Sequence, residues 1–420
     1  MAALLNVDEA LKQILVTIQP LSEESVGLAG ALGRIIAQDV IASSNLPPFA
    51  NSSMDGFAIR AADIVDANPQ NPVALQVVMD IPAGSAPTGQ INAGEAARIM
   101  TGAPLPQGAD SVIPVENTDA QWTPGSDIAP ATRVSVNRSV KPGDYVRLAG
   151  EDIRNGERII QHGTTLRPAE IGLLAAVGQH SVKVVRQPRV GIVSTGDELF
   201  DIDEDLTPGK IRDSNSYTLA ALVTVNGGIP IRIPTARDTL EDVRKRFKEA
   251  LAQKPDLILS SAGVSVGAFD VVRTVIDELG KVDFWRINLR PGKPLAFGQV
   301  GGVPFFGLPG NPVSAMVTFD VFVRPTLLKL GQRPDQTTTL NATITEDIHS
   351  DGRRSYIRVT LKHEDTGWVA RTTGTQSSGA LSSMMLADGL MIIPEDVQFL
   401  PAGSSLSIRL LRDLHELDRG

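Results

Sequence analysis

The chain has 420 residues, and its 42% hydrophobic and 21% charged content is that of a folded globular protein, which excludes a disordered tail. At about 150 residues per domain, this length predicts roughly three domains. The formal net charge of −9 excludes an overall basic surface for nucleic acid, and the absence of cysteine excludes disulfides and thiol chemistry. A hard metal ion must therefore be held by carboxylates or by a substrate.

The N-terminal segment has apolar residues at helical spacing, at Val7, Leu11, Ile14 and Ile18. We expect residues 1–45 to be largely helical and to close near Leu32–Gly33. Acidic residues stand where a secretion signal is basic, and no uncharged apolar run reaches the ~18 residues that span a membrane. A cytoplasmic protein without a membrane segment is the expectation.

A turn-rich stretch at 45–60 precedes a β-like region from 70 to 142, where Gly and Pro separate short apolar runs. Residues 142–166 have the pattern of a hairpin, and Pro168 opens a short helix over 168–178. From about 187 to 331, strands alternate with helices, which predicts a parallel sheet covered on both faces. Short strands return from 332 onwards and indicate a small closed β domain.

Three strands of the α/β region are followed by loops rich in Gly, Ser and Asp: GDEL after GIVST, AGVSVGAFD after LILSS, and PGNPVS after FFGL. The carboxyl ends of parallel strands collect chemistry, and the free amides at helix starts favour phosphate. We therefore predict an anion site where the three loops converge. The alternative is that each is an ordinary turn between a strand and a helix.

Charged residues in other turns add to this picture. Arg290 and Lys293 flank a Pro-Gly turn in RPGKPLAFG, which suits an oxyanion, although a solvated turn has the same pattern. Asp55, Asp152 and Asp238 are isolated carboxylates that could share in a Mg²⁺ site, or could simply be turn residues. The tail loop GTQSSGALSS, taken alone, has the composition of a flexible linker.

Seven motifs occur in order along nearly the whole chain, from about residue 5 to 415: PPFANSSMDGFAIR, RIMTGAPLP, GEDI, GIVSTGDEL, LSSAGVSVGAFD, RPGKPLAFG and GLPGNPVSAMVTF. Together they resemble the molybdopterin molybdenumtransferase family, which includes MoeA and the E domain of gephyrin. One departure is Arg290, because many members carry Lys there. Arg keeps the charge but has a rigid planar fork, so the geometry of the bound anion is what this departure affects.

The resemblance implies a multidomain α/β plus β protein. Residues 1–45 with 143–186 would form an N-terminal mixed α/β domain, and 46–142 an inserted β-rich domain. Residues 187–331 would form the molybdopterin-binding α/β domain with a parallel-rich sheet, and 332–420 a C-terminal β barrel. Family members are homodimers, with a cleft between the α/β domain of one protomer and the N-terminal half of the other.

The resemblance also implies a transferase of molybdenum cofactor biosynthesis. Its substrates would be molybdate and adenylylated molybdopterin, and the reaction would use Mg²⁺ and release AMP. Asp55, Thr101, Asp152 and Glu198 would act at the reacting centre, with Glu198 and Asp55 as the metal ligands. The substrate-binding positions would be Asp238, Gly263, Ser265, Gly267, Asp270, Arg290, Lys293, Pro309, Pro312 and Ser378.

The same resemblance leaves two alternatives open. One is a molybdopterin-binding scaffold that anchors a partner peptide, and the other is a paralogue that uses tungstate, an oxyanion of nearly the same size and charge. A transient contact with the molybdopterin adenylyltransferase is a further expectation, whereas nucleic acid and membrane are not expected partners.

Overall fold

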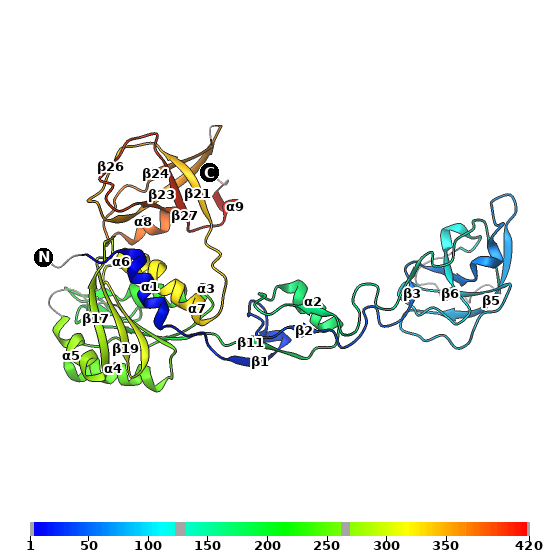
Figure 1. Cartoon of the computed structure of the whole chain (residues 1–420), viewed down its shortest axis with the longest axis horizontal. Coiled ribbons are helices and arrows are strands. Elements are labelled where there is room, and N and C mark those ends of the chain that lie inside the picture. The colour runs from blue at the N-terminus through cyan, green and yellow to red at the C-terminus, as the bar shows by residue number, and fades with distance from the viewer. Residues whose placement is uncertain (1–3, 122–131, 262–268, 366, 418–420) are drawn as a thin grey trace. The chain divides into compact units, whose positions relative to one another are not determined.

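The computed structural model describes residues 4–121, 132–261, 269–365 and 367–417 (Figure 1). The chain forms two compact units. Unit 1 comprises residues 1–24, 33–35 and 184–420, and unit 2 comprises residues 25–32 and 36–183. Strands β1 (Glu23–Gly27) and β11 (Ser181–Val185) span the boundary in sequence. The four-part division expected from the sequence stays a prediction.

Unit 1 contains a mixed sheet with the strand order β15–β12–β16–β20–β19–β17. Neighbours from β15 to β20 are parallel, whereas β19 is antiparallel to both of its neighbours, β20 and β17. This confirms the predicted parallel-rich sheet. The strands are β12 (Arg189–Ser194), β15 (Ile229–Arg232), β16 (Leu257–Ser261), β17 (Gly280–Arg286), β19 (Pro294–Val300) and β20 (Val303–Leu308).

Helices cover both faces of this sheet, as the buried apolar runs of β12 and β16 require. Buried residues of α4 (Leu240–Ala252) and α5 (Phe269–Leu279) form one core with the sheet. Residues of α1 (Val7–Thr17), α3 (Ser214–Val225), α6 (Pro312–Thr318) and α7 (Arg324–Leu330) form the other (Figure 1). A π-helical turn, Phe319–Val323, joins α6 to α7, because Pro325 lacks the N–H that a regular helix needs there.

The helix at the N-terminus is shorter than expected, since only Val7–Thr17 is helical. Asn6 caps it by accepting hydrogen bonds from the Asp8 and Glu9 amides. The helix ends at Thr17 with Ile18 as its C-cap, and Pro20 disfavours helical backbone at the next residue, Gln19. The prediction of helix up to residue 33 was therefore wrong, and the following residues form β1, a 3₁₀ turn (Leu28–Gly30) and β2 (Val40–Ile41).

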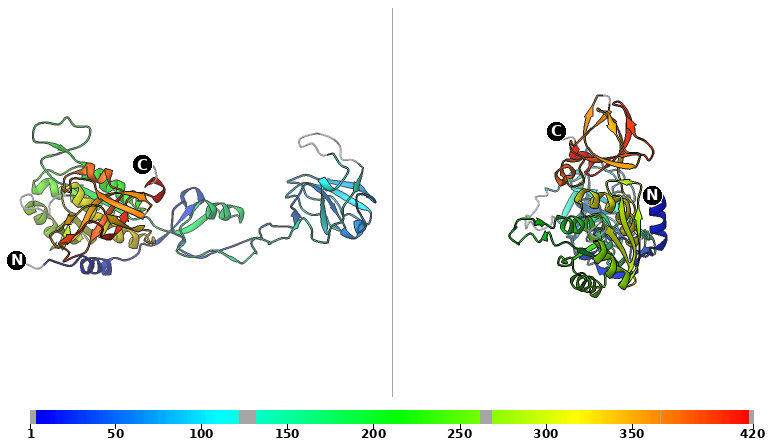
Figure 2. Two further views of the ribbon diagram at one scale, coloured as in Figure 1. Left: turned by 90° about the horizontal axis from the view of Figure 1, so that it is seen from above. Right: turned by 90° about the vertical axis from the view of Figure 1, so that its left-hand side faces the viewer.

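The C-terminal part of unit 1 is a closed barrel with the order β23–β24–β21–β27–β25 and a final pairing of β25 with β23 (Figures 1 and 2). This confirms the predicted C-terminal barrel. Its strands are β21 (Thr339–Ile344), β23 (Arg354–Glu364), β24 (Gly367–Thr372), β25 (Gly389–Ile393) and β27 (Ser405–Leu410). Smaller elements are β22 (Ile348–His349), β26 (Phe399–Leu400), α8 (Leu381–Leu386) and α9 (Leu414–Leu417).

Unit 2 holds a sheet with the order β7–β4–β6–β5–β8, which confirms the β-rich prediction for this region. The hairpin expected over 142–166 was wrong, because β9 pairs with β3 and β10 pairs with β2, both far upstream. The elements are β3 (Asn51–Ser52), β4 (Gly56–Ile59), β5 (Val73–Ile81), β6 (Glu95–Ile99), β7 (Ser111–Pro114), β8 (Arg133–Val136), β9 (Val146–Arg147), β10 (Arg158–Ile160), α2 (Pro168–Ala176) and 3₁₀ turns at Ala61–Ile64 and Val115–Asn117.

Helix α2 begins with Pro168, as predicted, and with a capping box. The Arg167 amide donates to Glu170 Oε2 at 2.8 Å, and the Arg167 guanidinium donates to Oε1 at 2.6 Å. The guanidinium hydrogen bond is the main reason that the pKa of the Glu170 carboxyl falls from 4.5 to about 2.

We expect Glu170→Gln to destabilise α2 by about 0.2–1 kcal/mol, because glutamine can keep the bond from the Arg167 amide but loses the ion pair with its guanidinium. Because the folded-state pKa lies below the unfolded one, Glu170 stabilises fully above about pH 4.5 and loses its effect as the pH falls toward about 2. Hydrogen exchange of residues 168–176 at a series of pH values measures this difference between the two proteins. A difference that stays constant down to pH 3 would contradict the assignment.

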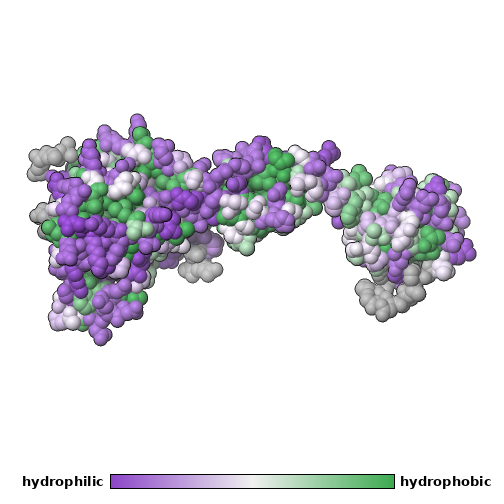
Figure 3. All heavy atoms as spheres, turned by 90° about the horizontal axis from the view of Figure 1, so that it is seen from below, coloured by the Kyte–Doolittle hydropathy of each residue, from purple (hydrophilic) through white to green (hydrophobic). Residues whose placement is uncertain are grey.

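Within the described residues, no helix is long and apolar enough to cross a membrane. The face viewed in Figure 3 carries hydrophilic residues over most of unit 1, interrupted by small hydrophobic groups.

Candidate active site

The strands of the α/β sheet end at one level. Ser194 pairs with Ser261, and Ser261 pairs with Leu308, so β12, β16 and β20 release their following loops at the same edge. Asn215 of α3 ties two of these exits together, because its Nδ2 donates to Ser261 Oγ and to the Gly310 carbonyl, both at 2.7 Å. The predicted convergence of the strand ends is therefore confirmed for the part of the chain that the structure describes.

Buried hydroxyl groups lie at this edge without a protein partner. The side-chain oxygens of Ser194, Thr195 and Ser260 are buried, and none of them forms a hydrogen bond with a described residue. A buried polar atom without a partner is costly, and its occurrence calls for a ligand or ordered water. The edge is therefore suited to a molecule with several polar atoms.

Two loops bring together a cluster of carboxylates, which we call the acidic turn: Asp197 and Glu198 follow β12, and Asp238 follows β15. The Asp197 amide donates to Asp238 Oδ2 at 3.4 Å, and the Asp238 amide donates to Asp197 Oδ1 at 3.2 Å. Asp238 Oδ1 is buried without a partner. Burial, together with the negative charges of Asp197 and Glu198, raises the pKa of the Asp238 carboxyl.

Gly196 is the residue that lets the acidic turn fold back on itself. Its φ is +153°, a backbone conformation that residues with a Cβ rarely adopt. A Cβ at this position would lie 2.7 Å from Glu198 Oε2. The Glu198 carboxylate thus packs against the bare backbone of Gly196, while Glu198 itself is exposed.

A second feature of unit 1 is a cationic pocket of about 400 Å³. Among the described residues that line it, none carries a carboxylate. The lining includes Arg290, Lys293, Arg353, Arg358, Ser314, Tyr356, Gln376 and Ser378. The structure therefore brings together three predicted substrate-binding residues, namely Arg290, Lys293 and Ser378.

Backbone hydrogen bonds hold the segment that carries Arg290 and Lys293. Arg290 lies in β18 (Leu289–Arg290), which pairs with the barrel strand β23. The Ile287 amide donates to the Lys293 carbonyl at 2.7 Å and closes the loop. Gly292 has a φ of +115°, and a Cβ there would lie 2.5 Å from the buried Thr318 Oγ1, so only glycine allows this close approach.

The tail loop is not a linker, contrary to the reading of its composition. The Gln376 side chain accepts a hydrogen bond from the Arg358 amide at 3.0 Å and donates one to the Arg358 carbonyl at 3.1 Å. The Ser378 carbonyl accepts from the Val313 amide of α6 at 3.1 Å. These contacts fold the loop over the pocket.

Three further predicted residues belong to unit 2. Asp55 and Thr101 lie together, because the Thr101 amide and hydroxyl donate to Asp55 Oδ1 at 2.7 and 2.8 Å. Asp152 is exposed, and its amide donates to the Leu46 carbonyl at 3.0 Å.

Three of the remaining predicted positions are described residues of unit 1. Pro309 follows β20, and Pro312 opens α6. Asp270 is part of α5. Gly263, Ser265 and Gly267 lie outside the described residues.

Comparisons with known proteins cover the whole of this architecture. Three family models match in succession: "MoeA N-terminal region (domain I and II)" at residues 5–178, "Probable molybdopterin binding domain" at 191–329, and "MoeA C-terminal region (domain IV)" at 341–411. The molybdopterin molybdenumtransferase 2 of Mycobacterium tuberculosis is 39% identical over 91% of this chain and 94% of its own length. This chain belongs to the molybdopterin molybdenumtransferase family.

Two further members of the molybdopterin molybdenumtransferase family illustrate the match. The enzyme of that name from Bacillus subtilis is 33% identical over 97% of this chain and 94% of its own length. The crystal structure of the molybdopterin biosynthesis MoeA protein from Pyrococcus horikosii has a TM-score of 0.82 at 33% identity, and the match covers 98% of this chain and 100% of that chain.

Sequence reasoning missed some residues that the structure places in this candidate site. Arg358 is 1% exposed, and its Nη2 donates to the carbonyls of Thr375 and Ser377. Burial lowers the pKa of this guanidinium. Its only sequence signal was a charge inside the apolar run YIRVTL. Arg353 and Asn215 were also missed, since neither stands in a motif that was singled out.

Proposed function

We propose that this chain inserts molybdenum from molybdate into adenylylated molybdopterin, using Mg²⁺ and releasing AMP. We further propose that it works in the cytoplasm as a homodimer. Family membership gives the reaction class. The observation that carries the finer proposal is the cationic pocket of Arg290, Lys293, Arg353 and Arg358 in the same unit as the unpartnered hydroxyls of the sheet edge.

The two features suit different parts of the substrates. Molybdate is a dianion, and a pocket lined by guanidinium and ammonium groups and hydroxyls offers it charge-assisted hydrogen bonds. The sheet edge, with Asn215 and the unpartnered Ser194 and Ser260 hydroxyls, suits the polar atoms of a pterin and its phosphates. Because the pterin dithiolene supplies sulfur to molybdenum, a chain without cysteine can perform this transfer.

The acidic turn fits a divalent cation. Asp238 Oδ1 lacks a partner, and Asp197 and Glu198 add negative charge beside it. No group of three or more His, Cys, Asp or Glu side chains in the described ranges is arranged to hold a metal by itself, so substrate oxygens would complete the coordination. A bound Mg²⁺ would supply charge for departure of AMP. Asp55 as a second metal ligand stays a prediction, as does the role of Asp152 in the cleft.

The decisive test measures AMP release from adenylylated molybdopterin and Mg²⁺ with and without micromolar molybdate. Release that depends on molybdate supports the transferase. Binding of the pterin without release would favour the scaffold, and release with tungstate alone would favour the tungstate-using paralogue.

We expect Lys293→Ala to weaken the affinity for molybdate by about tenfold or more, since a hydrogen bond to a charged group contributes about 1.5–3 kcal/mol. AMP release at a series of molybdate concentrations measures this change. Lys281→Ala, at an exposed lysine of β17, is the matched control. An unchanged molybdate dependence in Lys293→Ala would remove this residue from the anion site.

A further inference from the structure

Two cations converge on one carbonyl of the acidic turn. Lys210 Nζ donates to the Asp197 carbonyl at 2.7 Å, and Arg237 Nη1 donates to the same oxygen at 3.2 Å. Both charges also lie 5.6 Å from the centre of the Phe200 ring. The two lone pairs of one peptide oxygen are thereby used by two charged donors, which fixes the plane of the Asp197–Glu198 peptide.

The segment that delivers Lys210 is itself anchored. Strands β13 (Leu199–Phe200) and β14 (Ile211–Arg212) pair in parallel. The Ile211 amide donates to the Glu198 carbonyl at 2.8 Å, and the Asp213 amide donates to the Phe200 carbonyl at 2.8 Å. Lys210 therefore approaches the acidic turn from a strand end that is hydrogen-bonded to the same turn.

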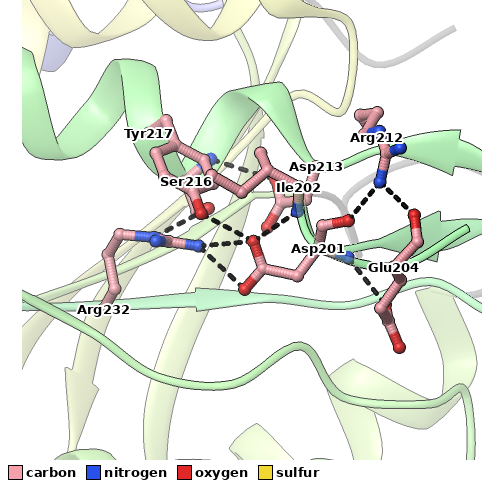
Figure 4. Close-up of polar contacts among 8 residues, drawn as sticks. All are labelled: Asp201, Ile202, Glu204, Arg212, Asp213, Ser216, Tyr217 and Arg232. Atoms are coloured by element: carbon pink, nitrogen blue, oxygen red, sulfur yellow. Dashed lines mark hydrogen bonds and ion pairs between the residues drawn. The ribbon is translucent and has the colours of Figure 1, made fainter.

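A polar cluster fastens the other side of this segment to α3 and β15 (Figure 4). The Tyr217 hydroxyl donates to Asp201 Oδ1 at 2.7 Å, and Arg232 contacts both Asp201 oxygens at 3.4 Å. The Arg232 guanidinium lies 3.5 Å from the centre of the Tyr217 ring. The Tyr217 hydrogen bond is the main cause that lowers the pKa of the Asp201 carboxyl, so this cluster is charged at neutral pH.

We propose that Lys210 and Arg237 are positioning residues for the divalent cation of the acidic turn. By holding the Asp197 carbonyl, they orient the peptide so that Glu198 lies against Gly196 and the reciprocal hydrogen bonds of Asp197 and Asp238 persist. Asp238 Oδ1 is then left free for the cation. This proposal rests on the proposed function, because it concerns the Mg²⁺ of that reaction.

The sign of the effect distinguishes positioning from simple electrostatics. Removing a positive charge near a cation site strengthens cation binding if only Coulomb forces act. If Lys210 instead orients the Asp197–Glu198 peptide, its removal weakens cation binding. We use Mn²⁺ as a spectroscopic probe for Mg²⁺. In Lys210→Met we expect the affinity for Mn²⁺ to fall by about fivefold to tenfold. In Lys210→Arg, which keeps a charged donor, we expect an affinity close to that of wild type.

The experiment uses the full chain. Electron paramagnetic resonance gives the affinity for Mn²⁺ with adenylylated molybdopterin present and molybdate left out, so that the substrate oxygens can complete the coordination. It is measured in wild type, Lys210→Met, Lys210→Arg and Arg237→Gln, and in Lys245→Met as a control on the exposed side of α4. AMP release then gives the Mg²⁺ concentration for half-maximal rate and the KM for adenylylated molybdopterin. In Lys210→Met we expect the Mg²⁺ concentration for half-maximal rate to rise and the KM for adenylylated molybdopterin to change less than about twofold.

Unchanged or tighter Mn²⁺ binding in Lys210→Met would overturn the proposal, as would a rise in the KM for the pterin alone, which indicates direct substrate contact. Hydrogen exchange outside residues 196–213 shows whether the variant is folded. If wild type releases no AMP but Mn²⁺ binding follows the expected order, the proposed function fails and the positioning role stands.

Discussion

Glu198→Gln is expected to reduce molybdate-dependent AMP release by at least about 100-fold, the usual scale for losing one group that acts at the transition state. Glu198 is exposed, and its carboxylate packs against Gly196 beside Asp197 and Asp238. Glutamine has nearly the same shape but no charge, so the turn can keep its conformation. Thermal melting should therefore stay close to that of wild type, as for most exposed substitutions.

The matched control for this variant is Asp203→Asn, which removes one charge from an exposed residue of the same segment. We expect it to keep nearly the wild-type rate. A folded Glu198→Gln protein with the wild-type rate would remove Glu198 from the reacting centre. Equal losses in both variants would mean that only the net charge of the segment matters.

Asp55→Asn is expected to have an effect of similar size, again at least about 100-fold on turnover. Asp55 Oδ1 accepts two hydrogen bonds from Thr101, and asparagine can preserve both through its own oxygen. The substitution therefore removes the negative charge while it keeps the local contact. The rate of AMP release at saturating Mg²⁺ and molybdate is the quantity to measure.

Asp63→Asn provides the comparison for Asp55. Asp63 is also a carboxylate of unit 2 that accepts a backbone hydrogen bond, from the Gly94 amide at 2.9 Å. We expect this variant to be active. If Asp55→Asn is as active as Asp63→Asn, the carboxylate of Asp55 has a structural role in the Thr101 turn and no part in the reaction.

Local sequence patterns correctly predicted the strands and helices of the α/β sheet, but they did not predict pairing between strands far apart in the chain. The buried runs of β12 and β16 and the helices between them indicated a covered parallel sheet, and this was confirmed. The hairpin over 142–166 failed because its strands pair with β2 and β3, more distant partners that no local pattern encodes. The long N-terminal helix failed because an apolar periodicity was extended past Pro20.

The candidate site shows the same division. Arg290 and Lys293 stood out because charges beside a Pro-Gly turn are conspicuous, and both line the cationic pocket. Arg358 did not stand out, because alternation along β23 places Ile357 and Val359 inward and suggests an outward-facing arginine. It is buried because the tail loop packs on it, and its Nη2 donates to the Thr375 and Ser377 carbonyls. These residues follow β24, so the contact is not visible in the local pattern of β23.

The pairing of β3 with β9 has a consequence during synthesis. Residues 53–145 separate the two strands, and at typical ribosomal speeds they take roughly 5–20 s to emerge. For that time the side of β3 that pairs with β9 is unpaired, although residues 102–105 can already hydrogen-bond to residues 50–52. Strand β2 is likewise unpaired until β10 follows. The sheet between them, β4 to β8, is complete before either pair can close. The middle of unit 2 can therefore fold before the β3–β9 and β2–β10 pairs form.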